Sequence, residues 1–420
     1  MGWSIVECGK DEKELMYWAA TQQHILTGGG LLTSCAWKFN ERELPHYYLG
    51  KSISHRMFNE WNSKLRDSDS QKILIGAWER TLFKGGQFIS NTNDTQVFNL
   101  QTSLLFIDMR FPNYRFLNST EIKNVRCLDD LTNHQLRLLA RQHCFSGVSL
   151  IQNSNSTLKT GICTRHHCID WNYHPQYPRN RPNQWKFIQS PDALQFDEYS
   201  VAFLPLKPHQ LHENAEPVPV YMESWRRYSN DSNGRNVFAM RLIPESDPEY
   251  EIYKMQSQFQ AQQSDPMSKE LIDAVFLVIG NHFAYVEDNR GALISDLSNK
   301  IRGSVGSGCA NLVDAAYRND DRDLMKKLLS VEGSYGQVKG SNTNSCWTVL
   351  RSTMPWKEAS RMLMEKELSI LCDLNLVKFK NRLWKVYENS FTKTQLENEL
   401  EFRIVSDFDG VNVAHQRAKL

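Results

Sequence analysis

The sequence lacks the features that mark nucleic-acid-binding and membrane proteins. Lys and Arg together number 49 against 48 Asp and Glu, so there is no excess of positive charge to attract phosphate groups or anionic lipids. The longest apolar run, residues 274–280, is far too short to cross a bilayer. The first residues have no apolar signal-peptide core, and Val6 stands where a myristoylation signal requires Ser or Thr. We therefore expect a cytoplasmic protein that binds neither nucleic acid nor membrane.

Cysteine pairs are also missing: the 9 cysteines are scattered and no CxxC occurs, which favours reduced thiols. One stretch, CTRHHCIDWNYH at 163–174, offers several side chains that zinc prefers. In a strand, however, alternate residues point to opposite faces, so His166 and Cys168 would lie on one face and Cys163 and His167 on the other. A single strand cannot close a tetrahedral site from both faces. An ordinary strand is the favoured interpretation, and we expect no metal and no cofactor.

Short strand-like segments separated by Gly, Pro and Asn dominate the chain from residue 73 onwards, a pattern typical of a barrel or sandwich. Apolar residues at helical spacing occur before residue 70 and, within the later region, at 128–144, 310–329 and 357–373. We therefore expect a mainly β protein with four parts. These are a helical N-terminal extension (1–70), a first β unit (71–235), a second β unit with a helical insertion at 294–330 (236–356), and a C-terminal extension (357–420).

Seven segments, in order, resemble the fungal Hri family and its bacterial relatives, in which each half of the chain is a lipocalin-like (calycin-type) β-barrel. The segments are Trp78-Glu79-Arg80, 100–112, 139–147, 163–171, 221–227, 276–288 and 346–356. The resemblance spans about residues 75–360 and implies two lipocalin-like barrels. It carries over no catalytic residue. Related double barrels include isomerases and hydratases, but this is an analogy at the level of the fold.

Several expected strands carry polar side chains on one face. The sets that share a face are Asp108 with Arg110; His166 with Cys168 and Asp170; Tyr221 with Glu223 and Trp225; and Trp78 with Arg80. If these faces point into a barrel, the charged groups must pair with one another or hold a polar ligand, because isolated charges are costly to bury. These polar faces have three interpretations. They form an internal ion-pair network, they line a functional pocket, or the register is reversed and they face solvent.

In the second unit, His282 shares a face with the small residues Gly280 and Ala284, which leave space beside it. This space would suit a ligand, although a hydrogen-bonded core histidine fits the same pattern.

Three functions remain open. The first is binding of a small, largely apolar ligand with a polar or anionic group, with Trp78, Arg80, Tyr221, Trp225 and His282 as ligand-binding residues. The second is a cofactor-independent isomerase, hydratase or cyclase. Its acid–base groups would be Asp108, Arg110, His166, Asp170 and Glu223. The third is a scaffold with filled barrels that contacts a protein partner through the terminal extensions.

Overall fold

The structure is a computed structural model of the 420-residue chain. It describes residues 65, 68–85, 88–115, 124–155, 157–175, 182–201, 219–228, 236–245, 247, 250–256, 273–290, 308–338, 347–363, 368–371, 375–398, 400 and 402–405. The expected N-terminal extension therefore lies mostly outside the described residues. No helix in the described ranges is long and apolar enough to span a membrane.

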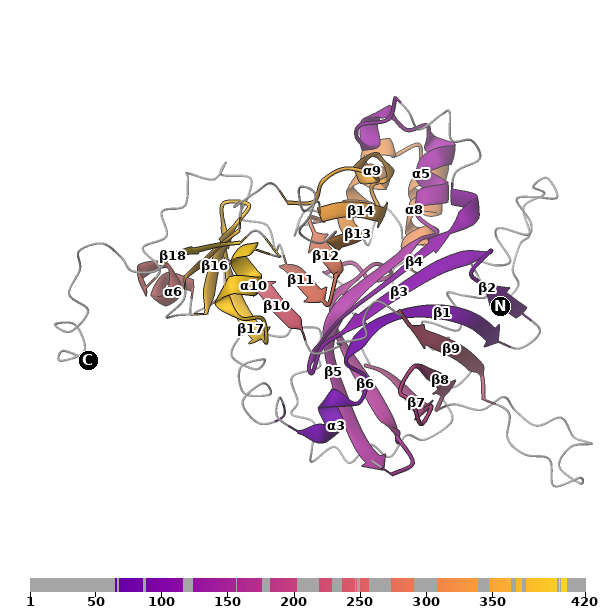
Figure 1. The fold of residues 1–420 in the computed structure, drawn as a ribbon. Coiled ribbons are helices and arrows are strands. Elements are labelled where there is room, and N and C mark those ends of the chain that lie inside the picture. The colour runs from indigo at the N-terminus through magenta and orange to yellow at the C-terminus, as the bar shows by residue number, and fades with distance from the viewer. Residues whose placement is uncertain are drawn as a thin grey trace, which may run out of the picture.

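The first unit is a closed antiparallel barrel of eight strands (Figure 1), which confirms the expected mainly β fold with a barrel. Each strand pairs with the next in the chain, and β1 pairs with β9 to close the ring. A short additional strand, β2 (Phe88–Asn91), pairs with the end of β1. The barrel strands are β1 (Gly76–Gly85), β3 (Thr95–Gln101), β4 (Leu105–Pro112), β5 (His143–Asn155), β6 (Thr160–Asp170), β7 (Asn183–Gln189), β8 (Gln195–Ser200) and β9 (Tyr221–Arg227).

One end of the barrel interior is filled and covered. A short helix, α3 (Asp69–Lys72), lies over this end, where Gln71 Nε2 donates to the Ile151 carbonyl at 3.1 Å. Inside it, Trp78 Nε1 donates to the Leu74 carbonyl at 3.0 Å. An eight-stranded barrel is narrow enough for side chains to fill it. The apolar side chains that do so are Leu74, Trp78, Val97, Ile151, Cys163, Trp185, Phe187, Phe196 and Trp225.

The second unit is a curled nine-stranded sheet, and the described pairings do not join its two edge strands. The curl nevertheless brings its ends together: Trp347 Nε1 donates to the Leu400 carbonyl at 3.2 Å, and the Trp347 ring stacks on Phe402 at 5.7 Å. From edge to edge the strands are β14 (Trp347–Ser352), β13 (Val331–Val338), β12 (His282–Asp288), β11 (Asp273–Ile279), β10 (Val237–Leu242), β17 (Arg382–Asn389), β16 (Leu376–Phe379), β15 (Ser369–Leu371) and β18 (Arg403–Val405).

The C-terminal boundary differs from the sequence-based expectation. Residues 357–420 were expected to lie outside the β units, but β15–β18 all belong to the second sheet. The side chains of Trp384 and Phe402 fill the same core as Trp347 and Phe276, so this segment completes the second unit. Strands β15, β16 and β18 have only three or four residues and carry little periodicity of their own, so the pattern did not assign this segment to the second sheet.

Three of the described helices lie close together. In Figure 1, α5 (Asn133–Leu139), α8 (Cys309–Arg318) and α9 (Arg322–Leu328) cluster beside the end of the barrel. Asp314 on α8 accepts from Arg137 at 2.8 Å and from Arg141 at 2.5 Å, which ties the inserted helices to the first unit. Elsewhere in the described ranges lie α6 (Tyr250–Gln256) and α10 (Lys393–Asn398), and short 3-10 turns at η3 (Asn113–Arg115), η4 (Leu128–Asp130) and η8 (Pro355–Lys357).

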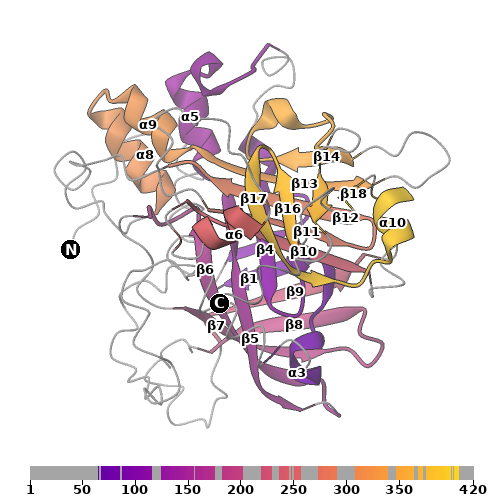
Figure 2. The ribbon, with the colours of Figure 1, turned by 90° about the vertical axis from the view of Figure 1, so that its left-hand side faces the viewer.

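The two units share one apolar layer. The outer face of the barrel contributes Phe98, Ile107 and Met109, and the second sheet contributes Leu277 and Tyr335. Strands β11 and β12 lie against β4 and β6 (Figure 2). The approach is closest at Gly333 on β13, where an added Cβ would lie 2.5 Å from Cys144 Sγ. The units are therefore packed together as tightly as a single core.

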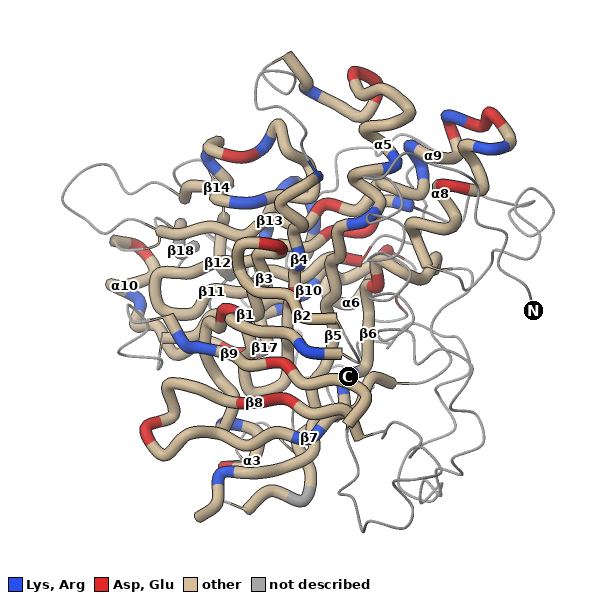
Figure 3. Tube along the Cα trace, turned by 90° about the vertical axis from the view of Figure 1, so that its right-hand side faces the viewer, with Lys and Arg blue, Asp and Glu red and all other residues tan. Residues whose placement is uncertain are grey.

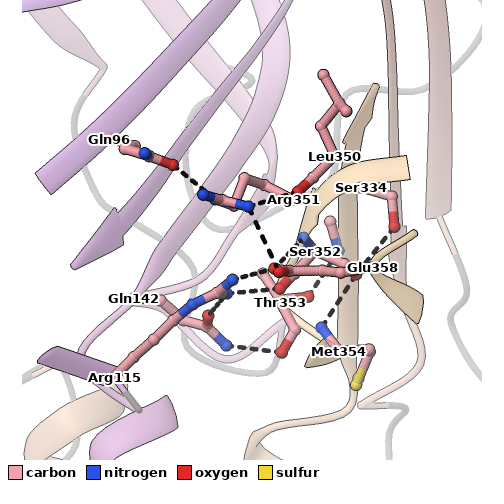
Figure 4. A network of polar contacts seen from close by, with 11 residues as sticks. Gln96, Arg115, Gln142, Ser334, Leu350, Arg351, Ser352, Thr353, Met354 and Glu358 are labelled. Carbon is pink, nitrogen blue, oxygen red and sulfur yellow. Dashed lines mark hydrogen bonds and ion pairs between the residues drawn. The ribbon is translucent and has the colours of Figure 1, made fainter. Parts of the chain in front are cut away.

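A polar network closes one side of this layer (Figure 4). Arg115, from the first unit, donates to the Ser352 carbonyl at 2.6 Å and forms an ion pair with Glu358. Arg351, from β14, donates in return to Gln96 Oε1 on β3 at 2.6 Å. Each unit thus supplies one arginine whose guanidinium group donates hydrogen bonds to residues of the other unit.

Candidate functional site

The polar half of the first barrel contains an ion-pair network built by side chains from four strands. Arg110 on β4 donates to Asp108 at 3.0 Å and to Glu223 on β9 at 3.1 Å. Arg80 on β1 also donates to Glu223, at 2.8 Å, and Arg165 on β6 donates to Asp108 at 3.1 Å. All of these side chains are buried. The register therefore points Asp108, Arg110, Arg80 and Glu223 inward, and the solvent-facing alternative is wrong for them.

A third carboxyl, Glu198 on β8, lies directly opposite Glu223 on β9 and accepts a hydrogen bond from Tyr221 Oη at 2.8 Å. Acidic segments are visible on both strands in Figure 3. Burial, together with the neighbouring charge of Glu223, raises the pKa of Glu198 to about 8. Glu198 is consequently neutral at pH 7. Glu198 and its strand were not singled out in the sequence, and QFDEYS at 195–200 gives no sign of which acid turns inward.

At Asp108 and Arg110 the ion pairs outweigh burial, whereas at Arg80 burial outweighs the bond to Glu223 and leaves the pKa below its usual value. Burial raises the pKa of Asp108, but Arg110 and Arg165 outweigh this and leave the pKa below its usual value. Burial also lowers the pKa of Arg110, and here Asp108 and Glu223 outweigh it and leave the pKa above its usual value. Guanidinium groups remain protonated in proteins.

A pocket that opens to solvent borders this network at the end of the barrel opposite α3. Its inner space takes about one water molecule. Its lining residues are Phe106, Asp108, Arg110, Phe145, Arg165, His167, Asn183 and Glu198. The Arg165 guanidinium lies over Phe106 at 4.4 Å and over Trp185 at 5.2 Å, between the polar and the apolar halves of the interior. Among the described residues, Arg165 Nε and Glu223 Oε2 are buried with no hydrogen-bond partner.

A β-bulge changes which residues of β6 face this pocket. Strand alternation predicted His166, Cys168 and Asp170 on one face, and this is wrong because the register with β5 shifts beside Gly147. His167 faces the pocket instead, and its Nδ1 lies 2.7 Å from Asp170 Oδ2. His166 lies on the opposite face of β6 and is buried, which lowers its pKa to about 3.

The aromatic residues predicted to bind a ligand lie in different places. Trp78 and Trp225 belong to the filled apolar half of the barrel, and Tyr221 is bonded to Glu198. His282 is not in the barrel interior, because it lies in the layer between the two units. There its Nδ1 lies 2.8 Å from Tyr335 Oη, and its ring stacks on Tyr228 at 4.7 Å. This arrangement is the hydrogen-bonded core histidine of the alternative interpretation.

In the parts of the chain that are described, no group of three His, Cys, Asp or Glu side chains is arranged to hold a metal ion. Burial raises the pKa of Cys163 and of Cys168 to about 12, so these thiols are unreactive at neutral pH.

Comparisons with known proteins add little to this geometry. No family model matches the chain, and no curated protein matches it. Among solved structures, the crystal structure of the uncharacterized protein YLR301w from Saccharomyces cerevisiae is similar, with 10% identity and a TM-score of 0.37. The similarity covers 75% of this chain and 98% of that chain. It is too remote to assign a function.

Proposed function

We propose that the first barrel binds the anionic group of a small organic acid in the pocket at its open end. The observation that carries this proposal is an imbalance of buried charge. Among the described residues, Arg80, Arg110 and Arg165 form ion pairs with only two carboxylates, Asp108 and Glu223. The third carboxyl, Glu198, has a raised pKa and accepts a hydrogen bond from Tyr221 Oη. Buried charges are stable only when they are paired, so the network lacks one negative charge that a monoanion would supply.

Two features favour an anion close to Arg165. This side chain lines the pocket, and its Nε has no partner among the described residues. A guanidinium group suits a carboxylate because its donors lie in one plane and can bind both oxygens. The ring of Phe106 lines the same pocket and would contact the apolar part of the acid.

The filled apolar half limits the size of the ligand. A largely apolar molecule occupying the whole interior would have to displace Trp78, Trp185 and Trp225, all of which are fully buried. We therefore propose a small acid at the open end, and not a ligand enclosed by the barrel. Membership of the double-barrel family is part of the same proposal, and the closed first barrel with a curled second sheet supports it.

The test is isothermal titration calorimetry of the full-length protein with acetate and benzoate, with acetamide and benzamide as neutral analogues. We expect the acids to bind and the amides not to bind. Arg165→Met should weaken acid binding at least about tenfold, because a hydrogen bond to a charged group contributes about 1.5–3 kcal/mol. The matched control is Arg226→Met, since that arginine is 61% exposed and pairs with Glu79.

The pH dependence gives a second measurement. The affinity for benzoate should fall as the pH rises through about 8, because ionised Glu198 would then supply the missing negative charge itself. Glu198→Gln cannot ionise and should lose this fall. If acetate and benzoate do not bind, or if Arg165→Met binds them as wild type does, the proposal is wrong, and a scaffold with filled barrels becomes the better interpretation.

A further inference from the structure

The inner space of the pocket is matched in size to a single small ion. It takes about one water molecule, so a molecule of several heavy atoms cannot lie wholly inside it. A chloride or bromide ion is only slightly larger than a water molecule and has no further atoms to accommodate. Among the anions that a guanidinium group attracts, the halides are therefore the class whose size fits this space.

Arg165 supplies the positive charge for such an ion. Its Nη1 donates to Asp108 Oδ2 at 3.1 Å, and its Nε is buried without a hydrogen-bond partner among the described residues. The same side chain lines the pocket. Buried N–H groups in proteins are almost always bonded, so an unpartnered donor on a residue that lines a space of this size indicates an acceptor held there.

The carboxyl groups in the lining offer little repulsion to an anion. Asp108 already accepts from Arg110 Nε at 3.0 Å and Nη2 at 3.3 Å, in addition to its bond from Arg165. Glu198 has a pKa raised to about 8 and is therefore largely uncharged at pH 7. Two guanidinium groups and one ionised carboxylate thus surround the space, since Arg110 and Arg165 both line it.

Asn183 adds a neutral donor to the same space. It lies directly opposite Arg165 in the ladder between β6 and β7, and residues paired in this way share one face of the sheet. Its side chain lines the pocket, and a side-chain amide has two N–H donors. Phe106 and Phe145 form apolar walls, which favour an ion that sheds its hydration water easily. Chloride and bromide do so more readily than fluoride.

We propose that the inner space of this pocket binds a chloride ion between Arg165 and Asn183, and that this chloride competes with the carboxylate of an organic acid. The inference rests on the proposed anion site and assigns it a regulator. Both anions need the guanidinium group of Arg165, so they cannot bind together. The affinity for an organic acid then depends on the chloride concentration around the protein.

The direct measurement is the width of the chlorine NMR signal of sodium chloride with the full-length protein. Chloride held on a protein relaxes fast, so we expect the signal to broaden, and bromide or benzoate to reverse the broadening. Sodium sulfate at equal ionic strength should not reverse it, because a sulfate ion exceeds the space. If the space holds water only, benzoate will reverse no broadening, and the inference is wrong. Reversal by sulfate as strong as by bromide would also overturn it.

Calorimetry with benzoate separates this inference from the proposed anion site. Benzoate should bind most tightly in sodium sulfate without chloride. At equal ionic strength, each tenfold increase in chloride above its own Kd should raise the apparent Kd of benzoate about tenfold. If benzoate binds equally in both salts, the chloride inference is wrong and the anion site stands. If bromide reverses chloride broadening but benzoate binds in neither salt, the halide site stands and the organic-acid proposal fails.

Two variants test the residues that hold the ion. Arg165→Met should weaken chloride binding at least about tenfold, and Asn183→Leu about two- to tenfold, because a bond to a charged group contributes more than a neutral one. Asn183 is only half-buried, so its variant should fold. Gln184→Leu is the matched control, since Gln184 lies on the outer face of β7 and donates to Thr164 Oγ1 at 3.0 Å. Chloride binding by folded Asn183→Leu and Arg165→Met proteins that equalled the control would overturn the inference.

Discussion

At the scale of single residues, the first barrel depends on charges that are buried in pairs. Arg110 is the centre of this network, since it bonds both Asp108 and Glu223. Its guanidinium also lies 6.0 Å from the centre of the Phe145 ring. Removing Arg110 takes a hydrogen-bond donor away from both buried carboxylates, Asp108 and Glu223, and a buried charged group that loses a donor is costly.

Arg110→Ala should therefore lower the free energy of unfolding by about 3–5 kcal/mol. Arg226→Ala is the control and should change it by less than about 1 kcal/mol, because exposed ion pairs contribute little. Urea unfolding followed by tryptophan fluorescence measures both. A melting curve of Arg110→Ala that matched wild type would show that the network does not stabilise the barrel.

At the scale of elements, the bulge in β6 decides which histidine meets the pocket. Gly147 on β5 makes the bulge possible, because a Cβ at this position would lie 1.9 Å from the His166 carbonyl oxygen and 2.9 Å from the Cys168 backbone N. Both contacts are with backbone atoms, which cannot rotate away. The two strands can approach this closely only with glycine at position 147.

Gly147→Ala should destabilise the fold by about 1–3 kcal/mol, as overpacking in a core does. It should also displace His167, while anion binding at Arg165 changes less. Thermal unfolding measures the loss of stability, and calorimetry with benzoate measures anion binding. Gly161→Ala is a useful comparison, because a Cβ there would meet the Phe187 ring at 2.9 Å, a side chain that can shift. Equal effects of the two substitutions would contradict the role given to the bulge.

Strand alternation predicted much of the site and failed where the strands are irregular. It grouped Asp108 with Arg110, and the structure joins them at 3.0 Å. It selected His166 in place of His167, because the shift in register beside Gly147 is not visible in β6 itself. It missed Glu198 and Arg165, since pairing across a barrel depends on register between strands, and one sequence does not contain that information.

At the scale of the whole molecule, four histidines in the described part of the chain are buried in a neutral form. Burial lowers the pKa of His143 and His166 to about 3, and of His174 and His282 to about 4. In the unfolded chain a histidine titrates near 6.5. Between these values the unfolded state binds protons that the native state does not, so stability falls as the pH falls.

The free energy of unfolding should therefore decrease from about pH 6.5 to pH 4, by at most about 1.4 kcal/mol per pH unit for each histidine. Glu198 has the opposite effect on stability, because its pKa is raised in the native state, so the native state binds one proton that the unfolded state releases.

His282→Gln should be less stable than wild type at pH 7, since it loses the bond to Tyr335, but the difference in stability should narrow as the pH falls. The urea midpoints of the two proteins between pH 7 and pH 4 measure this difference. A difference in midpoint that did not change with pH would contradict the expected titration of His282.

The closure of the barrel sets an order of events during synthesis. The Arg80–Glu223 bond joins residues 143 positions apart, so the ring is complete only when β9 has been made. At that moment Phe98 and the rest of the outer apolar face have no cover, because Tyr335 and its neighbours on the second sheet are roughly a hundred residues away. At about 5–20 residues per second, the ribosome needs roughly 5–20 seconds to supply them. For that interval the nascent chain carries an exposed apolar face, which makes it a client for chaperones that bind such surfaces before the second unit arrives.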